Sequence, residues 1–428
     1  RGSLLHGCLA FLVVGFCLGH EFLQFDLGSL PLTLDRLVLG GLLAAFVVQR
    51  RAGSVQRKPV AWFEWTLLGF ALVLVLSTFT HDWQQNAPRK VSPIWRLVAG
   101  FLMPIMLYWI ARQSRITESG LRTVYAALGL LGVFLAGTAL AEISQQWWLV
   151  FPPHIADPKR GIHFGRARGP TLNAQSLGLY LDVCLLSFCL WIWKLPRPAR
   201  LLGLLTIPAW LAAIYFTYTR CVWLGLALGV LVLVGLGLRG PRRVAALGLM
   251  VSAGLLVVML KWNDLVSIQR EAGAAAARSS VDQRSSFTYV SWKMFLDHPW
   301  WGVGYSQFNQ AAKPYLSDRD TPLELELIRE QPNHDTFLAL LTETGLIGLG
   351  LYLLVLVGWA RSAWQLWRDG GLPTWARIQG LAMLSVMGMV ASPALFFDLT
   401  YSPHDHWLLF FLAGITVGLR QALSAGPV

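Results

Sequence analysis

The sequence predicts an all-α polytopic membrane protein with about twelve transmembrane helices and one large, partly helical outer loop. Hydrophobic residues make up 55% of the 428 residues and charged residues only 14%, whereas a soluble domain holds about 25% charged residues. Apolar runs of about 17–25 residues recur along the chain, and a helix of that length crosses a bilayer. Many of the 20 Trp residues lie near the ends of these runs, as interfacial aromatic belts require.

The apolar runs divide the chain into three parts. Residues 1–260 hold the first nine predicted spans, residues 261–334 form the large outer loop, and residues 335–428 hold the last three spans. In chain order, the predicted spans are 4–19, 30–48, 60–80, 93–111, 120–141, 172–193, 199–217, 220–238, 243–260, 335–359, 375–397 and 404–422.

Lys and Arg in the short connections orient these spans, because cytoplasmic loops carry them in excess. They gather in alternate connections, at 50–58, 112–122, 194–200, 239–243 and 361–377. Both termini are therefore expected in the cytoplasm. The large loop is expected in the periplasm, beside the inner membrane of a bacterium. No cleavable signal peptide is expected at the start of the sequence.

Composition also excludes several classes of function. All five Cys lie in apolar runs, so neither a disulfide framework nor a cysteine metal site is expected. The net charge is +12, but a basic membrane protein need not bind nucleic acid, and no nucleic acid partner is expected. The sequence has no Gly-rich phosphate loop and no Asp-x-Asp, which argues against an ATP-driven pump and a cytoplasmic nucleotide-sugar enzyme. No cofactor is expected.

Basic residues on the outer side are not explained by insertion topology. Guanidinium groups bind phosphate through two parallel hydrogen bonds, so an outer set of arginines predicts an anionic ligand held at the membrane surface, with a diphosphate as the main candidate. The outer basic residues are Lys159, Arg160, Arg166, Arg168, Arg220, Arg270, Arg278, Arg284 and Lys293.

The large loop has the pattern of an ordered segment. An amphipathic helix is expected from about Ser279 to about Leu296, with Arg284, Thr288 and Ser291 on one face. Pro and Gly then break the helix within 297–305, where aromatic residues such as Trp300 suit a sugar-stacking surface. Residues 318–330 are acidic and are expected to be solvated.

Three residues are the main catalytic candidates. Arg220 and Arg284 are expected to bind the anion, although each could instead be an interfacial or surface charge. His334 begins a span, and an imidazole there could act as a general base on a sugar hydroxyl, or could simply be a polar helix end. Asp335 and Glu343 are candidates to orient or tune it.

Two further groups are auxiliary candidates. Arg166, Arg168 and Asn173 could contact substrate or could form a basic turn. An outer cluster before the last span could be imagined to hold a metal, but its spacing matches no zinc pattern and no metal is expected. This cluster consists of Asp398, His404, Asp405 and His406.

These features resemble the O-antigen ligase family, within a superfamily that also holds O-antigen polymerases and pilin O-oligosaccharyltransferases. The resemblance covers most of the chain in topology. In residues it rests on Arg220-x-x-x-Leu224, on His334 to Gly345, and on the turn from Asp297-His298-Pro299 to Gly302-Val303-Gly304 downstream of Arg284.

The resemblance implies a fold and a reaction. The fold would be similar to glycosyltransferase C. The reaction would move O-antigen polysaccharide from undecaprenyl diphosphate to a sugar of lipid A–core, at the periplasmic face, without metal, and by an inverting displacement. It implies that Arg220 and Arg284 bind the diphosphate and that His334 activates the acceptor hydroxyl or assists diphosphate binding, with Arg166 and Arg168 as auxiliary groups.

Other functions stay open. An O-antigen polymerase or a pilin O-oligosaccharyltransferase would differ only in the acceptor, and no sequence feature fixes the acceptor. A flippase or transporter for a lipid-linked oligosaccharide would be expected to show internal repeats and broken spans at the membrane midplane. Neither is evident, and the long outer loop is better explained by chemistry at one surface.

Overall fold

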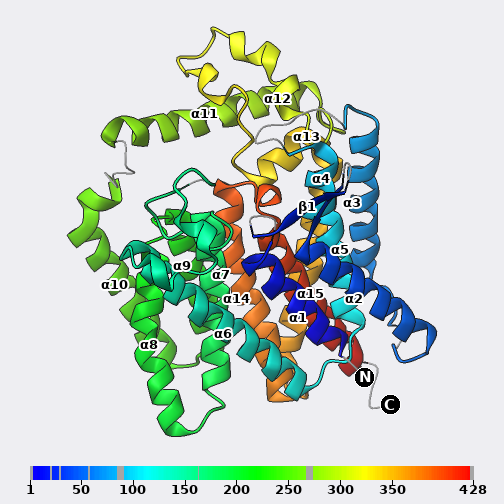
Figure 1. Cartoon of the computed structure of the whole chain (residues 1–428), viewed down its shortest axis with the longest axis vertical. Coiled ribbons are helices and arrows are strands. Elements are labelled where there is room, and N and C mark those ends of the chain that lie inside the picture. Colours follow the sequence, from blue (N-terminus) through cyan, green and yellow to red (C-terminus); the bar gives the residue numbers. More distant parts are fainter. Residues whose placement is uncertain are drawn as a thin grey trace.

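The computed structural model describes residues 3–19, 22–27, 30–55, 58–83, 91–161, 163–266 and 273–424. Within these ranges the chain is a bundle of long helices with a helical cap at one end (Figure 1). The long helices are α1 Leu4–Cys17, α2 Leu34–Arg51, α3 Trp62–Phe79, α5 Met103–Gln113, α6 Glu118–Ile143, α7 Ala174–Ile192, α8 Arg197–Tyr215, α9 Arg220–Gly237, α10 Pro241–Val266, α11 Gly273–Asp297, α13 Thr336–Arg368, α14 Thr374–Phe396 and α15 Pro403–Ser424.

Short elements complete the fold. They are α4 Pro93–Leu97, the π-turn η2 Val98–Leu102, α12 Phe308–Ala311, the 3-10 turns η3 Trp147–Leu149, η4 Pro153–Ala156, η5 Lys313–Ser317, η6 Leu325–Ile328 and η7 Leu399–Tyr401, and the strands β1 Gln24–Leu27 and β2 Leu30–Thr33. Helix α4, the π-turn and α5 follow one another without a break, so that they form one span.

The predicted fold class is confirmed, and each of the twelve predicted spans coincides with a helix or, for 93–111, with the continuous α4–η2–α5 segment. Among the described residues, nine helical segments are long and apolar enough to cross a membrane. Of the other three, α1 is apolar but shorter, α2 is amphipathic, and α10 runs on to Val266 at the edge of the described residues.

One prediction of the all-α reading is wrong in detail. Strands β1 and β2 form an antiparallel hairpin between α1 and α2, with Gln24 opposite Thr33 and Leu27 opposite Leu30. The second span therefore starts as a helix only at Leu34. Each strand is only four residues long. Alternation of polar and apolar residues over so short a stretch does not distinguish a strand from the neighbouring apolar runs.

Helices α9, α13 and α14 pack closely because small residues let the backbones approach. A Cβ atom at Gly225 of α9 would lie 2.4 Å from the carbonyl oxygen of Met389 in α14. A Cβ atom at Gly380 of α14 would lie 2.5 Å from the carbonyl oxygen of Ala363 in α13. Small residues serve this purpose in membrane bundles, where apolar burial alone does not drive helices together.

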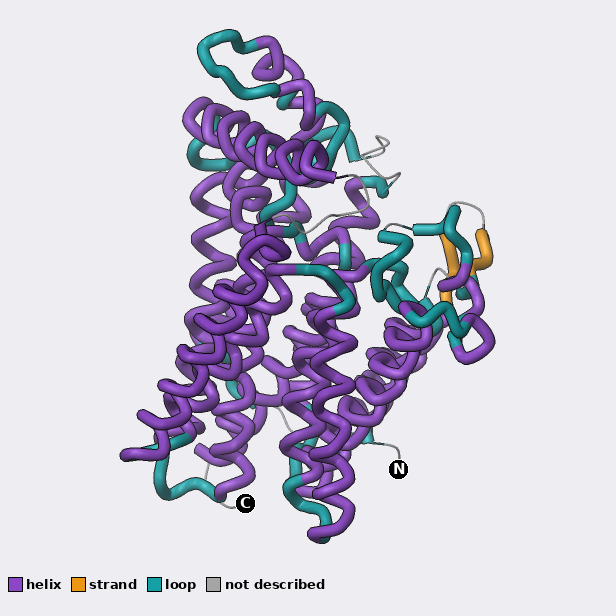
Figure 2. The backbone as a smooth tube through the Cα atoms, turned by 90° about the vertical axis from the view of Figure 1, so that its left-hand side faces the viewer, coloured by secondary structure: helices purple, strands orange, loops and turns teal. Residues whose placement is uncertain are grey.

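The segment between α10 and α13 caps the end of the bundle farthest from the chain termini (Figures 1 and 2). Helix α11 lies across that end and packs against a small apolar core. This core belongs to the cap and is distinct from the core of the bundle. This core consists of Phe287, Val290, Met294, Phe308, Ala312, Leu316, Leu325 and Ile328. The acidic stretch predicted to be solvated therefore contributes two buried side chains, Leu325 and Ile328.

Candidate active site

The turn between α8 and α9 places Arg220 at the cap end of the bundle. The indole nitrogen of Trp223 donates to the carbonyl oxygen of Ile214 at 3.1 Å, and the Trp223 ring stacks on Tyr215 at 5.2 Å between centroids. These contacts close the turn and fix the first residue of α9, which is Arg220. The Arg220 side chain is exposed, so the turn between α8 and α9 presents a guanidinium at the surface.

Helix α11 places Arg284 over the end of α14. The helix turns Phe287 and Val290 into the cap core, while Arg284 lies on the exposed side with its guanidinium carbon 5.5 Å from the centroid of the Phe396 ring. The Arg284 charge also lies close enough to Cys221 to interact with its thiol. The residue next to Arg220 in the chain is therefore within electrostatic range of Arg284.

The packing of α9 on α14 brings Arg220 to the same level. Gly225 contacts Met389 and Pro393 across this interface. The two helices run in opposite directions, so moving from Gly225 back to Arg220 corresponds to moving forward along α14 to about Phe396. Arg220 and Arg284 thus lie at the level of the end of α14, on two different helices.

His334 reaches the same place from the start of α13. The amide of Asn333 donates to the Ser291 hydroxyl of α11 at 3.1 Å, which ties the residue before His334 to the cap. The His334 ring then packs edge-on against Phe287 at 5.1 Å and lies 6.5 Å from the Phe397 ring. Arg284 lies against Phe396, His334 lies near Phe397, and Arg220 starts α9 at the same level of the bundle; these three residues are called the outer site below.

The backbone around His334 is held by a cap and a bridging hydroxyl. Asp335 caps α13 by accepting from the backbone N–H groups of Phe337 and Leu338 at 2.8 and 2.9 Å. Thr336 donates to the carbonyl oxygen of Phe397 at 2.9 Å and accepts from the N–H of Leu399 at 3.0 Å. The start of α13 is therefore fastened to the end of α14.

Asp335 has a perturbed acidity. Burial raises the pKa of its carboxyl from an ordinary value of 3.8 to about 6, the two capping N–H bonds oppose that change, and the negative charge of Asp398 adds to it. The carboxylate of Asp335 accepts the capping hydrogen bonds of α13. Its predicted role in tuning His334 stays a prediction.

The turn after α11 docks on a kink in α13. Gly345 has φ 65° and ψ −165°, a conformation that is essentially limited to glycine. Val303 and Gly304 donate backbone hydrogen bonds to the carbonyls of Thr342 and Glu343, both at 3.0 Å. This turn carries Trp300, which is 63% exposed, so the ring predicted to stack on sugar points away from the core.

A buried ion network lies beneath the outer site, and the sequence analysis did not identify its central residue, Arg96. The Arg96 guanidinium donates to both oxygens of Glu343, at 2.8 and 2.7 Å, and to Asp398 at 2.5 Å. The guanidinium carbon lies 4.7 Å from the centroid of the Tyr305 ring and 4.8 Å from that of Tyr401. The network joins α4, α13 and the α14–α15 connection. The sequence feature that could have indicated this network is the position of Arg96 inside the apolar run 93–111.

The prediction that Glu343 orients His334 is therefore wrong. The partner of Glu343 is Arg96, which donates to both of its carboxylate oxygens. The other acidic and histidine residues of the outer cluster likewise have separate partners. Asp405 accepts from Ser176 at 2.9 Å, and His406 Nδ1 lies 2.8 Å from the carbonyl oxygen of Gly100. Among the described residues, no three His, Cys, Asp or Glu side chains gather as a metal site would require.

Arg168 occupies a buried structural position. Its guanidinium donates to the carbonyl oxygens of Arg160, Ile155 and Asp157 at 2.6, 2.8 and 2.7 Å, and it pairs with Glu142 at 3.5 Å. These bonds fold the connection between α6 and α7. A ligand role for Arg168 would require them to break, so the structure does not favour that prediction.

Arg166 and Asn173 lie in the same connection, which meets the α8–α9 turn where the N–H of Ala167 donates to the carbonyl oxygen of Phe216 at 3.0 Å. Arg166 is half-buried and already has a partner. Asn173 caps α7 by accepting from Gln175 at 3.0 Å and donates to Ser402 at 2.7 Å. Arg270 lies outside the described residues, as does the side chain of Arg278. Substrate roles for these residues stay predictions.

Asn173 also lines a polar cavity of about 130 Å³ at this end of the bundle. Three other lining residues, Thr33, Asp35 and Thr171, each have a buried oxygen without a hydrogen-bond partner among the described residues. Unpaired buried oxygens are costly, so this cavity suits water or a hydroxyl-rich ligand.

Asp182 is a second residue that the sequence analysis missed. It is fully buried in α7, and neither carboxylate oxygen has a hydrogen-bond partner in the part of the chain that the structure describes. Gly178, one turn earlier, packs against Val222 of α9, so Asp182 lies on the face of α7 toward the α9 helix that carries Arg220. An acid inside an apolar run was its sequence signal.

The outer site can bind an anion. Neither Arg220 nor Arg284 forms an ion pair with any carboxylate among the described residues. Two guanidinium groups without a carboxylate partner, at the level of Phe396 and Phe397, can hold a doubly charged phosphate group. The adjacent imidazole supplies a group that can accept or donate a proton at neutral pH.

Part of the chain resembles a known protein family. Residues 205–353 match the family model described as O-antigen ligase. No curated protein matches the sequence. The matched segment contains Arg220, Arg284 and His334, whereas Arg166, Arg168 and Asn173 lie before it. The family predicted from the short motifs is thereby confirmed for residues 205–353, which carry an O-antigen ligase domain.

Proposed function

We propose that the protein transfers O-antigen polysaccharide from undecaprenyl diphosphate to a sugar of lipid A–core, at the periplasmic face of the bacterial inner membrane. The O-antigen ligase domain supports glycosyl transfer of the O-antigen ligase or polymerase type. The observation that carries the proposal is the position of Arg220, Arg284 and His334 at the level of the end of α14, with both guanidinium groups unpaired by described carboxylates.

The two arginines act on the donor. Their charges bind the diphosphate that links the polysaccharide to the polyprenyl chain. As the bond between the anomeric carbon and the diphosphate oxygen breaks, its electron pair moves to that oxygen and negative charge grows there. Fixed cationic groups aimed at this charge lower the barrier. The charged arginines fill the place that a metal takes in other phosphate-transfer sites, so the proposed reaction is metal-independent.

His334 acts on the acceptor. A sugar hydroxyl of lipid A–core attacks the anomeric carbon from the side opposite the diphosphate, and its proton passes to a ring nitrogen of His334. The new glycosidic bond forms as the old one breaks, which inverts the anomeric configuration. Holding two lipid-anchored substrates at one membrane surface also supplies the proximity that a bimolecular reaction needs.

Reconstitution tests this proposal. Purified protein in liposomes is supplied with undecaprenyl-diphosphate-linked glycan and rough lipopolysaccharide in EDTA, and the products are separated by gel electrophoresis. The proposal expects laddered lipopolysaccharide from the wild type and its loss from Arg220→Ala, Arg284→Ala and His334→Ala. Arg319→Ala, which removes an exposed arginine of the cap away from the outer site, is the matched control and keeps activity.

Other products would identify the alternatives. A polymerase would lengthen the carrier-linked glycan and leave lipopolysaccharide unchanged. A pilin O-oligosaccharyltransferase would require a Ser or Thr acceptor. Movement of the carrier across the bilayer without any new glycosidic bond would indicate a flippase, and the arginines would then be a cargo site.

A further inference from the structure

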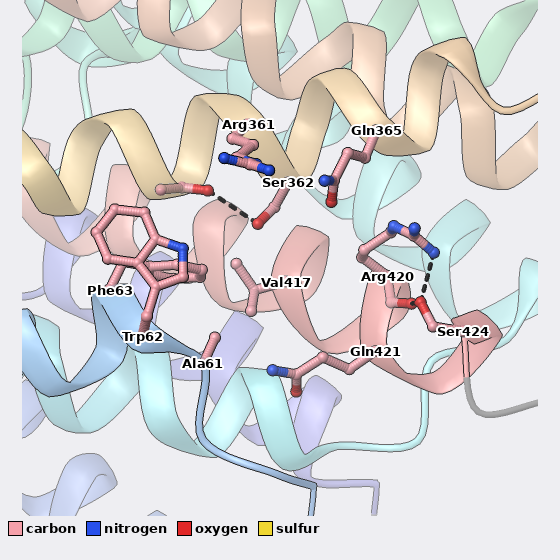
Figure 3. Close-up of a pocket in the computed structure, with 11 residues that line it drawn as sticks. Ala61, Trp62, Phe63, Arg361, Ser362, Gln365, Val417, Arg420, Gln421 and Ser424 are labelled. Carbon is pink, nitrogen blue, oxygen red and sulfur yellow. Dashed lines mark hydrogen bonds between the residues drawn. The ribbon is translucent and has the colours of Figure 1, made fainter.

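A cavity of about 440 Å³ lies at the end of the bundle opposite the outer site, between α3, α13 and α15 (Figure 3). Helix α13 starts beside His334 and reaches the cavity at Gly358, 22 residues further on, which corresponds to roughly 33 Å along a helix. The volume is in the range of about 300–1,000 Å³ that small-ligand sites occupy. The cavity is therefore separate from the outer site.

The polar lining of this cavity is cationic. Figure 3 shows Arg361, Gln365 and Arg420 around the same opening. No acidic side chain is among the lining residues that the structure describes. Arg420 bonds to Ser424, and Arg361 is exposed without a partner among the described residues. Two guanidinium groups without an acid favour an anionic ligand.

Two buried polar atoms at the cavity also lack partners in the described chain. They are Nε of Arg420 and Oε1 of Gln421. A buried donor on a charged group is costly to leave unpaired, so a ligand that accepts from Arg420 would satisfy it. The amide nitrogen of Gln421 is already fixed, because it donates to the carbonyl oxygen of Pro59 at 3.1 Å.

The cavity also lies at the start of a long helix. Trp62 and Phe63, the first two residues of α3, line it. Their backbone N–H groups have no partner within the helix, and the positive end of the helix dipole points the same way. Trp62 is half exposed on the outside of the bundle, as suits an aromatic residue at the level of lipid headgroups.

We propose that this cavity binds a phosphate ester anion, and that its occupant is the headgroup of an anionic glycerophospholipid. Arg361 and Arg420 bind the phosphate, the start of α3 faces the negative charge, and Trp62 lies beside the acyl chains. Free inorganic phosphate shares the same chemistry and is the other source that a test must separate. The inference does not depend on the glycosyl transfer proposed for the outer site.

Binding to the purified full-length protein in detergent tests the inference. Dihexanoyl phosphatidylglycerol, sodium phosphate and dihexanoylglycerol are titrated separately, and affinity is measured from the shift of the apparent melting temperature and by native mass spectrometry. Phosphatidylglycerol is expected to bind the wild type, and the Arg361→Ala/Arg420→Ala variant is expected to bind it at least tenfold more weakly. Arg368→Ala removes an exposed arginine two turns further along α13, outside the cavity, and should bind like wild type.

Each outcome decides the matter. Sodium phosphate binding as tightly as phosphatidylglycerol, and weakened in the double variant, would support the anion site with free phosphate as its occupant. Binding of phosphatidylglycerol that is equal in wild type and double variant, or equal binding of the phosphate-free dihexanoylglycerol, would overturn the proposal. If the double variant is not monodisperse, Arg361→Ala alone decides, because that side chain is exposed, and a threefold or greater loss is expected.

Discussion

Arg284 combines exposure with a defined place beside Phe396, and a substitution there tests its role in isolation. Arg284→Ala is expected to lower the rate of lipopolysaccharide formation by about 10²–10³, the usual effect of removing one charged or polar donor from a developing anion. The fold should be unchanged, because the side chain is exposed and its described ring contact is with Phe396. Initial rates in the reconstituted reaction measure the effect.

Arg284→Lys distinguishes charge from geometry. Lysine keeps the charge but cannot form two parallel hydrogen bonds to phosphate, so an intermediate rate is expected. If Arg284→Ala reacts at the wild-type rate while Arg220→Ala is inactive, Arg284 is not part of the anion site and Arg220 is.

Asp335 predicts a pH dependence of stability. Its folded-state pKa is raised by burial from 3.8 to about 6, so between these values the folded state binds more protons than the unfolded state. The resulting stabilisation is present in full below about pH 4 and is lost as the pH rises through about 6. The apparent melting temperature of the wild type in detergent should therefore fall over this interval by more than that of Asp335→Asn.

Asparagine is the appropriate substitution, because it retains the helix cap without titrating. Asp320→Asn, at an exposed carboxylate of the cap, controls for a general loss of negative charge and should follow the wild-type curve. Parallel curves for the wild type and Asp335→Asn would show that the Asp335 carboxyl does not titrate in this range.

At the scale of residues, the sequence predicted the outer site better than its surroundings. Arg220, Arg284 and His334 could be found because each stands at a boundary between polar and apolar sequence. Glu343 was assigned to the wrong partner for the opposite reason. Which oxygen a guanidinium meets depends on segments far away in the chain, and Arg96 and Glu343 are 247 residues apart.

Among the elements, the kink of α13 controls how the cap meets the bundle. A Cβ atom at Gly345 would lie 2.3 Å from the backbone of Trp300. Gly345→Ala is therefore expected to destabilise the protein by at least about 2 kcal/mol, from the glycine-only backbone conformation together with the clash. It should also lower activity, because the turn at 299–304 can no longer dock. Thermal unfolding and the reconstituted rate are the two measurements.

Gly350 provides a matched control on the same helix. It has ordinary helical geometry, and a Cβ atom there would meet nothing within 4 Å. Gly350→Ala should stabilise α13 by about 0.5–1 kcal/mol. Equal effects of the two substitutions would mean that the kink has no special role.

The Arg96 network joins three elements, and its residues should respond unequally. Arg96→Met leaves the carboxylates of Glu343 and Asp398 buried without their shared cation, which costs about 3–5 kcal/mol in comparable buried pairs. Glu343→Gln should be milder, since Arg96 keeps Asp398 and an amide oxygen. Fluorescence-detected size exclusion after heating measures both, and a larger loss in Glu343→Gln would contradict this order.

Elements were predictable in proportion to their length. Twelve long helices follow from apolar runs, which are local and strong signals. The β1–β2 hairpin, the π-turn after α4 and the kink at Gly345 depend on one or a few residues each. Helix α11 already includes Gly273, the first described residue of this segment and six residues before the expected start at Ser279.

At the scale of the whole molecule, the proposed chemistry depends on which side of the membrane the cap faces. The cap and the chain termini lie at opposite ends of the bundle (Figure 2). Arg361 and Arg420 belong to the end that carries the termini, together with Lys58, whose ammonium donates to the carbonyl oxygens of Arg112 and Gly418 at 2.6 and 3.1 Å. An excess of basic residues predicts a cytoplasmic location for this end, so the cap is expected in the periplasm.

Cysteine labelling tests this orientation directly. Ser317 in the cap and Gly370 between α13 and α14 are both exposed, and each can be changed to Cys with little disturbance. In spheroplasts, a membrane-impermeant maleimide should label Ser317→Cys at once and Gly370→Cys only after permeabilisation. The wild type is the control, because three of its five cysteines are buried and the others half-buried. The reverse pattern would put Arg284 and His334 in the cytoplasm. The outer site could then not reach a periplasmic acceptor, and ligation to lipid A–core would be untenable even though the family assignment would stand.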